Sequence, residues 1–490
     1  MDIVIVGGGT AGWSSAYGFS AMFGEQYGKP KNFNVTIIDS SHIPPIGVGE
    51  STLPEINKFH NKFGSINPEN YNWVRNCNGT AKTGSQFNNF KKGRDWFFPY
   101  HTKEDTISLV YDEYLNKPYI EDYYDRHCKF KKDEPIPPLT YYGNISYHID
   151  ASKYQQFLKD LVLTRPNVTY IQSAVDKVVL NKEGAVDKLI LDNNKELKAD
   201  LYIDCTGFKS VLRSKMPGSS WDSFSDSLLT NQAFVYSLPY IDEKKQSLNK
   251  TTATAMNAGW IWHVPLGDCI RFGYVHSNNH ISNEDDKKEL REFLIKNQGY
   301  AESDFDNLEP RFVQFKTGSV NEAWHKNVLA VGLSSSFIEP LGSQGMYLFQ
   351  LTIMEAFDLL TKKQMLDDLK DDFEKQGIDI SITPRFRTLP TIPYMFEGEI
   401  KAFNKSIKDS TYNMKEAMEM FFRLSDREDT QFWKDIKQPL SEEQQELVDI
   451  CSQDDPSKLM VKYNKYTSRP FFKKIDLIIF INLFKGKKLK

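Results

Sequence analysis

The sequence predicts an α/β fold with a parallel sheet at the N-terminus, an inserted antiparallel sheet and a helical C-terminal part. Three patterns support this prediction. The first forty residues read as strand, glycine-rich turn, helix and strand, with continuous apolar strands typical of a sheet buried on both faces. Between residues 230 and 320 apolar and polar residues alternate, as in antiparallel strands. From Met346 onward the pattern is largely helical, with few glycines.

The composition is that of a folded globular chain and disfavours several other classes of protein. Of 490 residues, 40% are hydrophobic and 26% are charged, so the chain can bury a core without disulfide or metal staples. The 61 Lys and Arg do not exceed the 65 Asp and Glu, so we expect no nucleic-acid partner. The five cysteines are far apart and form no CxxC or Cys/His pattern, so we expect no metal site.

Neither a secretory leader nor a membrane span is expected. Asp2 follows Met1 at once, and the first apolar run opens directly into glycines. No apolar run reaches the roughly 18 residues that a membrane span needs. The nearest case, residues 475–484, contains Asp476 and Asn482. We therefore expect a cytoplasmic protein.

The N-terminal turn has the pattern of a dinucleotide-binding site. Gly7-x-Gly9-x-x-Gly12 lies between the apolar strand 3–6 and a helix. Gly7 permits the tight turn, Gly9 lets a pyrophosphate approach the backbone, and Gly12 allows close packing of helix on strand. The alternative is a glycine-rich turn of purely structural use.

Two features beside the glycines strengthen this prediction. The helix opens with Thr10 and Ala11, where free amide groups and the positive helix end favour a phosphate. The next strand, residues 35–38, ends on Asp39, whose carboxylate can accept hydrogen bonds from a ribose.

The dinucleotide is expected to be FAD rather than NAD(P). The chain has no second GxGxxG motif for a nicotinamide domain. The segment 204–208 ends another strand, and its Gly207 would let the backbone approach a flavin nucleotide. Cys205 in this segment is interpreted as a small buried hydrophobe rather than a redox thiol. The parallel sheet is therefore predicted to be Rossmann-like, of the glutathione-reductase type.

The predicted domains are discontinuous in the sequence. Residues 66–150 are rich in Tyr, Phe, Trp, Asn and Pro and are expected to form long excursions around a pocket. We assign residues 1–110, 150–215 and 325–360 to the FAD-binding module, 111–149 and 216–324 to the substrate-side antiparallel sheet and loops, and 361–490 to a helical C-terminal region.

Several segments together resemble the flavin-dependent halogenases of the tryptophan halogenase family. Residues 259–265, GWIWHVP, are similar to that family's GWxWxIP signature, and residues 47–52, GVGEST, are similar to its GVGEAT segment. Residues 204–208 match its DCTGF, and residues 324–341 match its W-x-x-N…GL…F-x-EPL run. The matches extend from residue 3 to about residue 350, and the last 140 residues contain no motif match.

The resemblance implies a cofactor, co-substrates and a partner. FAD in its reduced form, FADH2, would react with O₂ to a C4a-hydroperoxide, and attack by chloride, bromide or iodide would release hypohalous acid. Because no nicotinamide module is visible, reduced flavin would come from a separate NAD(P)H-dependent flavin reductase. The resemblance adds these residues to the cofactor site: Gly49, Glu50, Ser51, Val175, Gly332, Leu333 and Met346.

Lys82 is the candidate catalytic residue. It lies in Gly79-Thr80-Ala81-Lys82-Thr83-Gly84, which resembles the segment that holds the family's catalytic lysine. A lysine can polarise hypohalous acid by a hydrogen bond, or form a haloamine if burial lowers its pKa. The alternative is a solvated surface lysine.

The run Pro340-Leu341-Gly342-Ser343-Gln344-Gly345, just before a helix, is the candidate halide site. A nest of backbone amides at this position can bind an anion. By the family pattern the amides of Gln344 and Gly345 hold the halide, and Met346 lies near the flavin ring. Ser343 of this run is expected to be a substrate-side residue. The alternative is an ordinary helix N-terminus with Ser343 as its cap.

The same run departs from the tryptophan-specific branch. That branch has EPLEST, whereas Gly342 replaces the second Glu here. The missing carboxylate would orient the electrophile and receive the ring proton, so the departure favours a phenol or another electron-rich ring over tryptophan. It also widens the site, as in a viral branch with relaxed substrate and halide choice. Glu339 either substitutes for the carboxylate in part or has a structural role.

Two groups of aromatic residues are candidates for the substrate side. Trp260 and Trp262 share one face of a strand and form either a wall between flavin and substrate or part of the core. Phe98, Pro99 and Tyr100 stand where the family has a His-Pro-Phe that sandwiches an aromatic substrate. Their alternative role is loop packing.

These predictions describe halogenation of a small electron-rich aromatic, of phenol or indole type, through hypohalous acid and Lys82. Two other functions stay open. A flavin monooxygenase would hydroxylate its substrate and need no halide. A non-catalytic protein would bind FAD without turnover.

Overall fold

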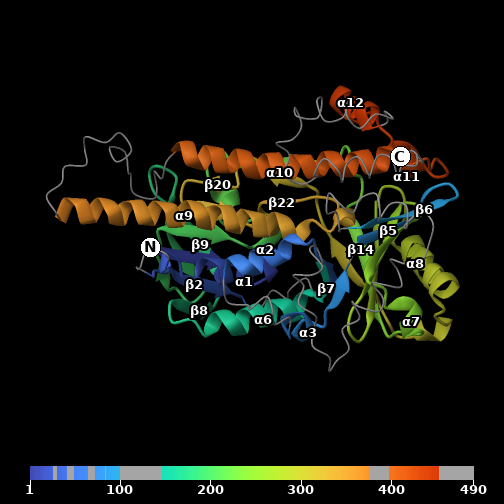
Figure 1. Ribbon diagram of the computed structural model, residues 1–490, viewed down its shortest axis with the longest axis horizontal. Coiled ribbons are helices and arrows are strands. Elements are labelled where there is room, and N and C mark those ends of the chain that lie inside the picture. The colour runs from blue at the N-terminus through green and yellow to red at the C-terminus, as the bar shows by residue number, and fades with distance from the viewer. Residues whose placement is uncertain are drawn as a thin grey trace.

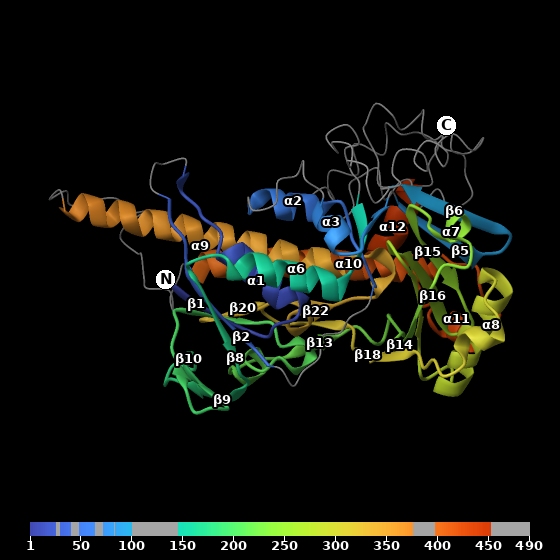
Figure 2. The same cartoon turned by 90° about the horizontal axis from the view of Figure 1, so that it is seen from below.

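The computed structural model describes residues 1–25, 30–40, 49–63, 72–82, 84–99, 146–375 and 397–451. The chain builds two large sheets side by side, and two long helices lie beside them (Figures 1 and 2). This mixed α/β architecture, with a parallel sheet, an antiparallel sheet and a helical C-terminal part, confirms the predicted fold class.

The first large sheet is the predicted parallel one. Four of its five strand pairings are parallel, and only the edge strand β20 runs antiparallel. Its strand 2–6 contains Ile3, Val4 and Ile5, all buried, as the apolar run predicts. In sheet order the strands are β20 (Trp324–His325), β21 (Val328–Ala330), β12 (Leu201–Asp204), β1 (Asp2–Val6), β2 (Asn34–Asp39) and β8 (Val168–Gln172).

Helices α1 (Thr10–Phe19) and α6 (Ala151–Leu163) cover one face of this sheet. The first turn of α6 is capped by Asp150, whose carboxylate accepts hydrogen bonds from the amides of Ser152 and Lys153. A small antiparallel sheet packs on the other face. Its strands are β9 (Val175–Leu180), β10 (Val186–Leu191) and β11 (Glu196–Leu197).

The second large sheet has seven strands and is antiparallel except where β15 pairs with β5. On one face it packs against helix α8 (Asn283–Gln298), which begins at the Ser282 cap and ends at Gly299. In sheet order its strands are β18 (Arg311–Gln314), β14 (Gln232–Leu238), β17 (Ile270–His276), β16 (Gly259–Pro265), β15 (Lys250–Ala255), β5 (Gly84–Lys91) and β6 (Arg94–Pro99).

One predicted domain boundary needs correction here. Residues 84–99 were assigned to the FAD-binding module, but β5 and β6 belong to the seven-stranded sheet. These strands were assigned to the other module because their pairing is not visible in the local sequence. Residues Gly84–Asn88 pair in parallel with Lys250–Thr254, which lie far away in the sequence. Phe87 and Phe90 on β5 then bury their rings against Phe421 of the C-terminal part. Of the predicted segment 111–149, only the last four residues are described.

A three-stranded antiparallel sheet lies between the two large ones. It consists of β3 (Gly49–Ser51), β7 (Ser146–Asp150) and β4 (Thr80–Lys82), with β7 in the middle. One face presents Ala81, Tyr147 and Ile149 to the hydrophobic core. Because side chains alternate along a strand, the other face carries Ser51, His148 and Lys82.

The C-terminal part consists mainly of two long helices that lie side by side (Figure 1). Helix α9 (Gly345–Lys375) extends along the parallel sheet, and α10 (Glu397–Arg423) reaches the seven-stranded sheet, where Met414 and Phe421 are buried. Within the described ranges, the other α-helices are α2 (Glu55–Lys62), α3 (Asn72–Asn76), α7 (Glu243–Gln246), α11 (Gln431–Asp435) and α12 (Glu442–Cys451). A third small sheet contains β13 (Trp221–Ser223), β19 (Gly318–Val320) and β22 (Ser336–Phe337).

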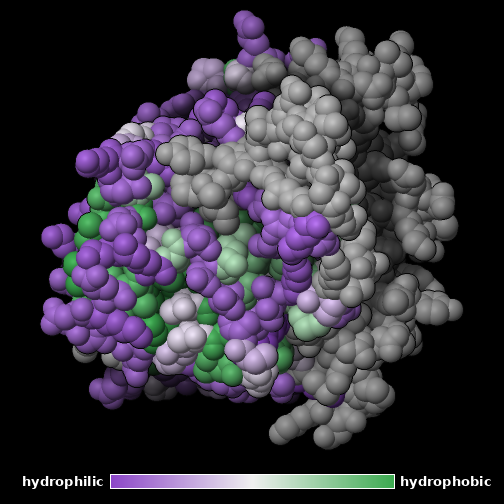
Figure 3. Space-filling view, turned by 90° about the vertical axis from the view of Figure 1, so that its left-hand side faces the viewer, coloured by the Kyte–Doolittle hydropathy of each residue, from purple (hydrophilic) through white to green (hydrophobic). Residues whose placement is uncertain are grey.

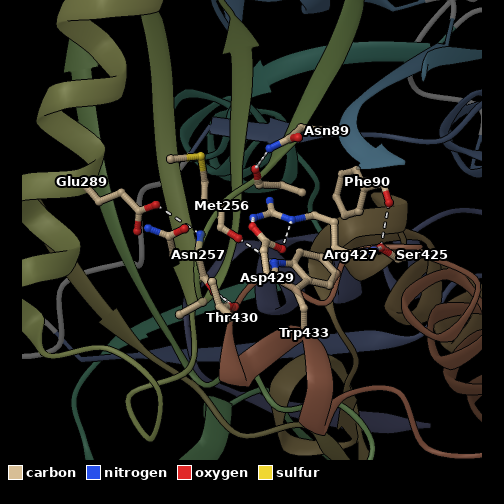
Figure 4. A network of polar contacts seen from close by, with 12 residues as sticks. Asn89, Phe90, Met256, Asn257, Glu289, Ser425, Arg427, Asp429, Thr430 and Trp433 are labelled. Atoms are coloured by element: carbon tan, nitrogen blue, oxygen red, sulfur yellow. Dashed lines mark hydrogen bonds and ion pairs between the residues drawn. The ribbon is translucent and has the colours of Figure 1, made fainter. Parts of the chain in front are cut away.

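The segment after α10 is fastened to the seven-stranded sheet by the contacts of Figure 4. Trp433 is fully buried and its indole N–H donates to the carbonyl of Met256 at 2.7 Å. Arg427 lies over the Trp433 ring and forms two hydrogen bonds with Asp429, at 2.9 and 2.6 Å. Ser425 donates to the carbonyl of Phe90 on β5. These contacts hold the helical part against the sheet that carries the signature segment 259–265.

The end of the molecule shown in Figure 3 carries mostly hydrophilic residues, with smaller groups of hydrophobic ones between them. Among the described residues, no helix combines the length and the apolar character that a membrane crossing requires.

We predict that this attachment contributes strongly to stability. Trp433→Ala should lower the free energy of unfolding by about 3–5 kcal/mol, because it leaves a cavity between α11 and the sheet. Trp433→Phe should cost about 1–2 kcal/mol, chiefly through the unpaired Met256 carbonyl. Urea unfolding followed by tryptophan-independent circular dichroism measures both. An alanine variant as stable as the wild type would contradict this packing account.

Candidate active site

The glycine-rich turn joins β1 to α1 at the carboxyl end of the parallel sheet. Gly7 has φ +108°, and a Cβ there would lie 2.4 Å from the carbonyl oxygen of Cys205. A Cβ on Gly12 would lie 1.8 Å from the Gly7 carbonyl oxygen, so helix and strand pack as closely as predicted. By contrast, a Cβ on Gly9 would meet nothing within 4 Å. Open space therefore adjoins the backbone where α1 begins.

The surroundings of the turn fit a dinucleotide. Gly9, the residue before α1, has no side chain that caps the helix. The first amides of the helix, including those of Thr10 and Ala11, are therefore the candidate partners of a phosphate. The Asp39 carboxyl group lies against Gly8, where a Cβ would meet its Cγ at 2.0 Å. Burial raises the Asp39 pKa, and the nearby Lys159 ammonium opposes this shift.

The other predicted cofactor residues fall into two groups. Gly332, with φ +73°, and Leu333 form a short turn against α1, since a Cβ on Gly332 would lie 2.7 Å from the Ala11 Cβ. Gly207 also has a positive φ, with open space beside it. Val175 packs at the edge of the hydrophobic cluster that underlies β1 and β2.

Glu50 and Met346 lie nearer to the centre of the molecule. Glu50 is half-buried on β3, and burial raises its pKa to about 7, against the opposing effect of the Arg271 charge. Met346 is buried in the first turn of α9. Gly49 precedes Glu50 on β3, whereas residues 47 and 48 of the same segment lie outside the described residues.

Lys82 is fully buried at the end of β4. Its Nζ donates to the Thr52 carbonyl oxygen at 3.2 Å and to Ser343 Oγ at 2.9 Å. Burial holds the pKa of this amine well below its ordinary value, because the charged form loses its hydration. The alternative of a solvated surface lysine is therefore excluded.

Residues 340–345 form the turn that leads into α9, and this turn contacts Lys82. Ser343 adopts the left-handed conformation, with φ +57°, which is uncommon for a residue other than glycine and marks a constrained backbone. Its hydroxyl bonds Lys82 and donates to Ser51 Oγ at 3.1 Å. Ser343, predicted to lie on the substrate side with a helix cap as the alternative, thus contacts the Lys82 amine. A Cβ on Gly345 would meet nothing within 4 Å.

The side chain of Gln344 fills the space that Gly342 leaves. A Cβ on Gly342 would lie 2.2 Å from Gln344 Oε1. The amide nitrogen of Gln344 donates to the Glu339 carbonyl oxygen at 2.6 Å, while its buried Oε1 has no hydrogen-bond partner among the described residues. A neutral amide therefore stands next to the position where a carboxylate would project.

Glu339 has a structural role in the strand–turn junction. Its two carboxylate oxygens accept hydrogen bonds from Trp260 Nε1, at 2.5 Å, and from the Thr230 hydroxyl. Burial raises its pKa to about 7, and these two hydrogen bonds oppose the shift. The arrangement fixes the ring of Trp260, and both carboxylate oxygens are engaged away from Lys82.

Trp260 and Trp262 share a face of β16, as predicted. Trp260 is buried in the core between this sheet and α10, and half-buried Trp262 packs at its edge. A Cβ on Gly273, the residue opposite Trp262, would lie 2.2 Å from the indole, so the ring lies flat over that glycine. Of the predicted aromatic sandwich, Phe98 and Pro99 end β6 but their side chains, like Tyr100, lie outside the described residues.

His148 and Thr251 belong to no motif in the sequence and were not predicted as site residues. His148 is fully buried, with Nε2 2.9 Å from Thr251 Oγ1 and Nδ1 3.0 Å from Thr80 Oγ1. Burial keeps its pKa well below the ordinary value, and the charges of Lys82 and His263 act in the same direction. Alternation in the segment 146–150 places His148 on one strand face, but its partners depend on strand register, which the sequence does not display.

Comparisons with known proteins agree with this geometry. The family model described as Tryptophan halogenase matches residues 2–481. The chain is similar to the 7-chloro-L-tryptophan 6-halogenase KtzR of Kutzneria sp. (strain 744), with 27% identity across 89% of this chain and 81% of that protein. It is also similar to the tryptophan 7-halogenase RebH of Lentzea aerocolonigenes, with 25% identity across 91% and 81%.

Solved structures show the same fold. The crystal structure of the tryptophan 6-halogenase SttH from Streptomyces toxytricini superposes with a TM-score of 0.75 and 24% identity, across 99% of this chain and 91% of that chain.

The pairing of Gly342 with Gln344 generates a stability prediction. Gly342→Glu should lower the thermal unfolding midpoint, because its Cβ must displace the Gln344 amide from a buried position. Adding Gln344→Thr should recover most of the loss, since the smaller side chain vacates that space. Differential scanning fluorimetry of the two single variants and the double variant measures this coupling. Additive effects of the two substitutions would contradict the assignment.

Proposed function

Because the chain belongs to the tryptophan halogenase family, we propose that it is a flavin-dependent halogenase acting on an electron-rich aromatic ring of phenol or indole type. The observation that carries the proposal is the buried Lys82 amine. Burial lowers the pKa of this amine well below its ordinary value and so favours the neutral form, which is the nucleophile. By the resemblance to the family, the oxidised halogen that this amine would attack is that of hypohalous acid.

The residues of the glycine-rich turn would hold FAD. Gly9 and the first amides of α1 suit its pyrophosphate, and Asp39 suits a ribose. When bound, FADH2 would supply two electrons and two protons for the overall conversion of O₂, a halide ion and one further proton into hypohalous acid and water. A separate NAD(P)H-dependent reductase would deliver the reduced flavin, because the sequence has a single dinucleotide turn.

The N-terminal end of α9 would hold the halide. The amides of Gln344 and Gly345 lie at a helix start, where the backbone carries a partial positive charge. No side chain projects from Gly345, and open space adjoins it. The turn also carries Ser343, whose hydroxyl bonds Lys82. The proposed halide site therefore directly follows, in the sequence, the residue that contacts the amine.

Lys82 would pass the halogen to the substrate. The neutral amine attacks the halogen of hypohalous acid, so that an N–X bond forms while the O–X bond breaks and water leaves. The haloamine then transfers the halogen to a ring carbon, so that a C–X bond forms while the N–X bond breaks, and the nitrogen takes up the proton that leaves the same carbon. The fixed contacts to Thr52 and Ser343 hold Nζ in one position during both steps.

The residue at position 342 favours an electron-rich aromatic substrate. Gly342 stands where a carboxylate would project, and both carboxylate oxygens of Glu339 are engaged by Trp260 and Thr230. An electron-rich ring stabilises its own cationic intermediate and needs less help from a carboxylate. Phenols and indoles are rings of this kind.

We predict that Lys82→Met abolishes halogenation, with a fall of at least a hundredfold in product formation. Methionine retains the length of the side chain and suits a buried site. The purified protein is supplied with FAD, NADH, a flavin reductase and each halide in turn, against a panel of phenols and indoles. Mass spectrometry detects the added halogen.

The matched control is Lys363→Met, which replaces another buried lysine on α9 that pairs with Asp367. It should keep activity within about twofold, and FAD binding should be unchanged in both variants. Retention of more than a tenth of the activity in Lys82→Met would contradict the proposal. Halide-independent gain of oxygen by the substrate would favour a hydroxylase instead.

A further inference from the structure

An unbroken chain of hydrogen bonds leads from Lys82 to His148. Lys82 Nζ lies 2.9 Å from Ser343 Oγ, and Ser343 Oγ lies 3.1 Å from Ser51 Oγ. Ser51 Oγ is 2.6 Å from Thr251 Oγ1, which lies 2.9 Å from His148 Nε2. Lys82, Ser343, Thr251 and His148 are buried, and Ser51 is half-buried. Three hydroxyl groups thus connect two basic groups inside the protein.

The strand register of the three-stranded sheet creates this chain. His148 on the central strand lies opposite Ser51 of β3 and opposite Thr80 of β4. Lys82 follows Thr80 by two residues and therefore shares its strand face. Thr251 comes from β15 of the neighbouring sheet and closes the gap between Ser51 and His148.

The direction of every hydrogen bond follows from one end of the chain. The Thr80 hydroxyl has a single hydrogen, which it donates to the Pro265 carbonyl oxygen at 2.8 Å. Thr80 must therefore accept from His148 Nδ1, so a neutral His148 carries its hydrogen on Nδ1. Nε2 is then an acceptor, and Thr251 donates to it.

The same reasoning continues from Thr251 to Lys82. The Thr251 hydrogen is committed to His148, so Thr251 accepts from Ser51, and Ser51 in turn accepts from Ser343. Ser343 then accepts from the Lys82 amine. Every donor thus points from Lys82 toward His148, which is the arrangement that a proton transfer from the amine to the imidazole requires.

We propose that a proton passes along this chain from the Lys82 ammonium to His148 and later returns. The proposal rests on the proposed halogenase function and adds a second basic residue to it. His148 is a positioning residue in this scheme, because it acts on the substrate only through Lys82.

The steps balance in protons and charge. First, an N–H bond of the Lys82 ammonium breaks and an Nε2–H bond forms on His148, leaving a neutral amine. The amine then takes the halogen from hypohalous acid and releases water. Finally the ring takes the halogen, while the amine regains the proton stored on His148 and also receives the ring proton. The ammonium and the neutral imidazole are restored.

The charges of the two groups are coupled. Burial lowers the pKa of both, and the Lys82 charge lowers the pKa of His148 further, so loss of the proton from Lys82 makes proton uptake by His148 more favourable. The other titratable group that acts on His148 is His263 on β16, whose own pKa burial lowers to about 4. His263 is therefore neutral near pH 7. The scheme also accounts for the absence of a carboxylate at Gly342, since the amine itself receives the ring proton.

The test interrupts the chain with a near-isosteric substitution. Thr251→Val removes the central hydroxyl, and Thr251→Ser restores it. The matched control is Thr252→Val, the adjacent threonine whose side chain points to the opposite face of β15. Thr251→Val should lower kcat at least tenfold, with the KM for the aromatic and the affinity for FAD unchanged. Thr251→Ser and Thr252→Val should stay within about twofold of the wild type.

A second measurement does not depend on turnover. Nitrogen-15 NMR of ring-labelled histidine distinguishes the two neutral tautomers, with the His148 signals assigned by their loss in His148→Gln. The chain requires hydrogen on Nδ1 in the wild type. Hydrogen on Nε2 would overturn the proposal.

The two proposals fail in different ways. An active wild type whose kcat is unchanged in Thr251→Val would overturn the proton relay and leave the halogenase function intact. A wild type that halogenates nothing under any halide would contradict the proposed function and the relay with it, even if the histidine tautomer were as expected.

Discussion

The burial of one primary amine is the constraint on which the site depends. Lys82 has no exposed surface, and its amine donates to the Thr52 carbonyl and to the Ser343 hydroxyl. An ammonium in this buried position loses its hydration, which lowers the pKa of the amine. The fold therefore favours the neutral form of an amine that is held away from bulk water.

The rest of the architecture serves this amine. The three-stranded sheet gives one face to the core and the other to Lys82 and His148, so the reactive face is rigid. The α9 turn brings Ser343 to the amine at the expense of a left-handed backbone conformation. Glu339, engaged by Trp260, ties that turn to β16. The proposed cofactor turn, the proposed halide turn and the amine thus come from three parts of the chain that the fold brings together.

The sequence predicted what is local and missed what is long-range. The strand–turn–helix unit around Gly7 and Gly12 is contiguous, and its apolar runs and glycines directly reflect burial and close packing. The seven-stranded sheet was foreseen between residues 230 and 320, but its strands at 84–99 were not, because a parallel pairing across some 165 residues leaves no local pattern. His148 was missed for the same reason, since its importance lies in cross-strand neighbours. The role of Gln344 required the space beside Gly342 to be seen.

The most direct test of the account is the titration of the Lys82 amine in the folded protein. Nitrogen-15 NMR of protein labelled at lysine Nζ would identify its signal by its absence from the Lys82→Met spectrum. Because burial disfavours the charged form, the account predicts that this amine loses its proton far below the ordinary lysine pKa of 10.5. A Lys82 signal that titrates together with the surface lysines would contradict the account.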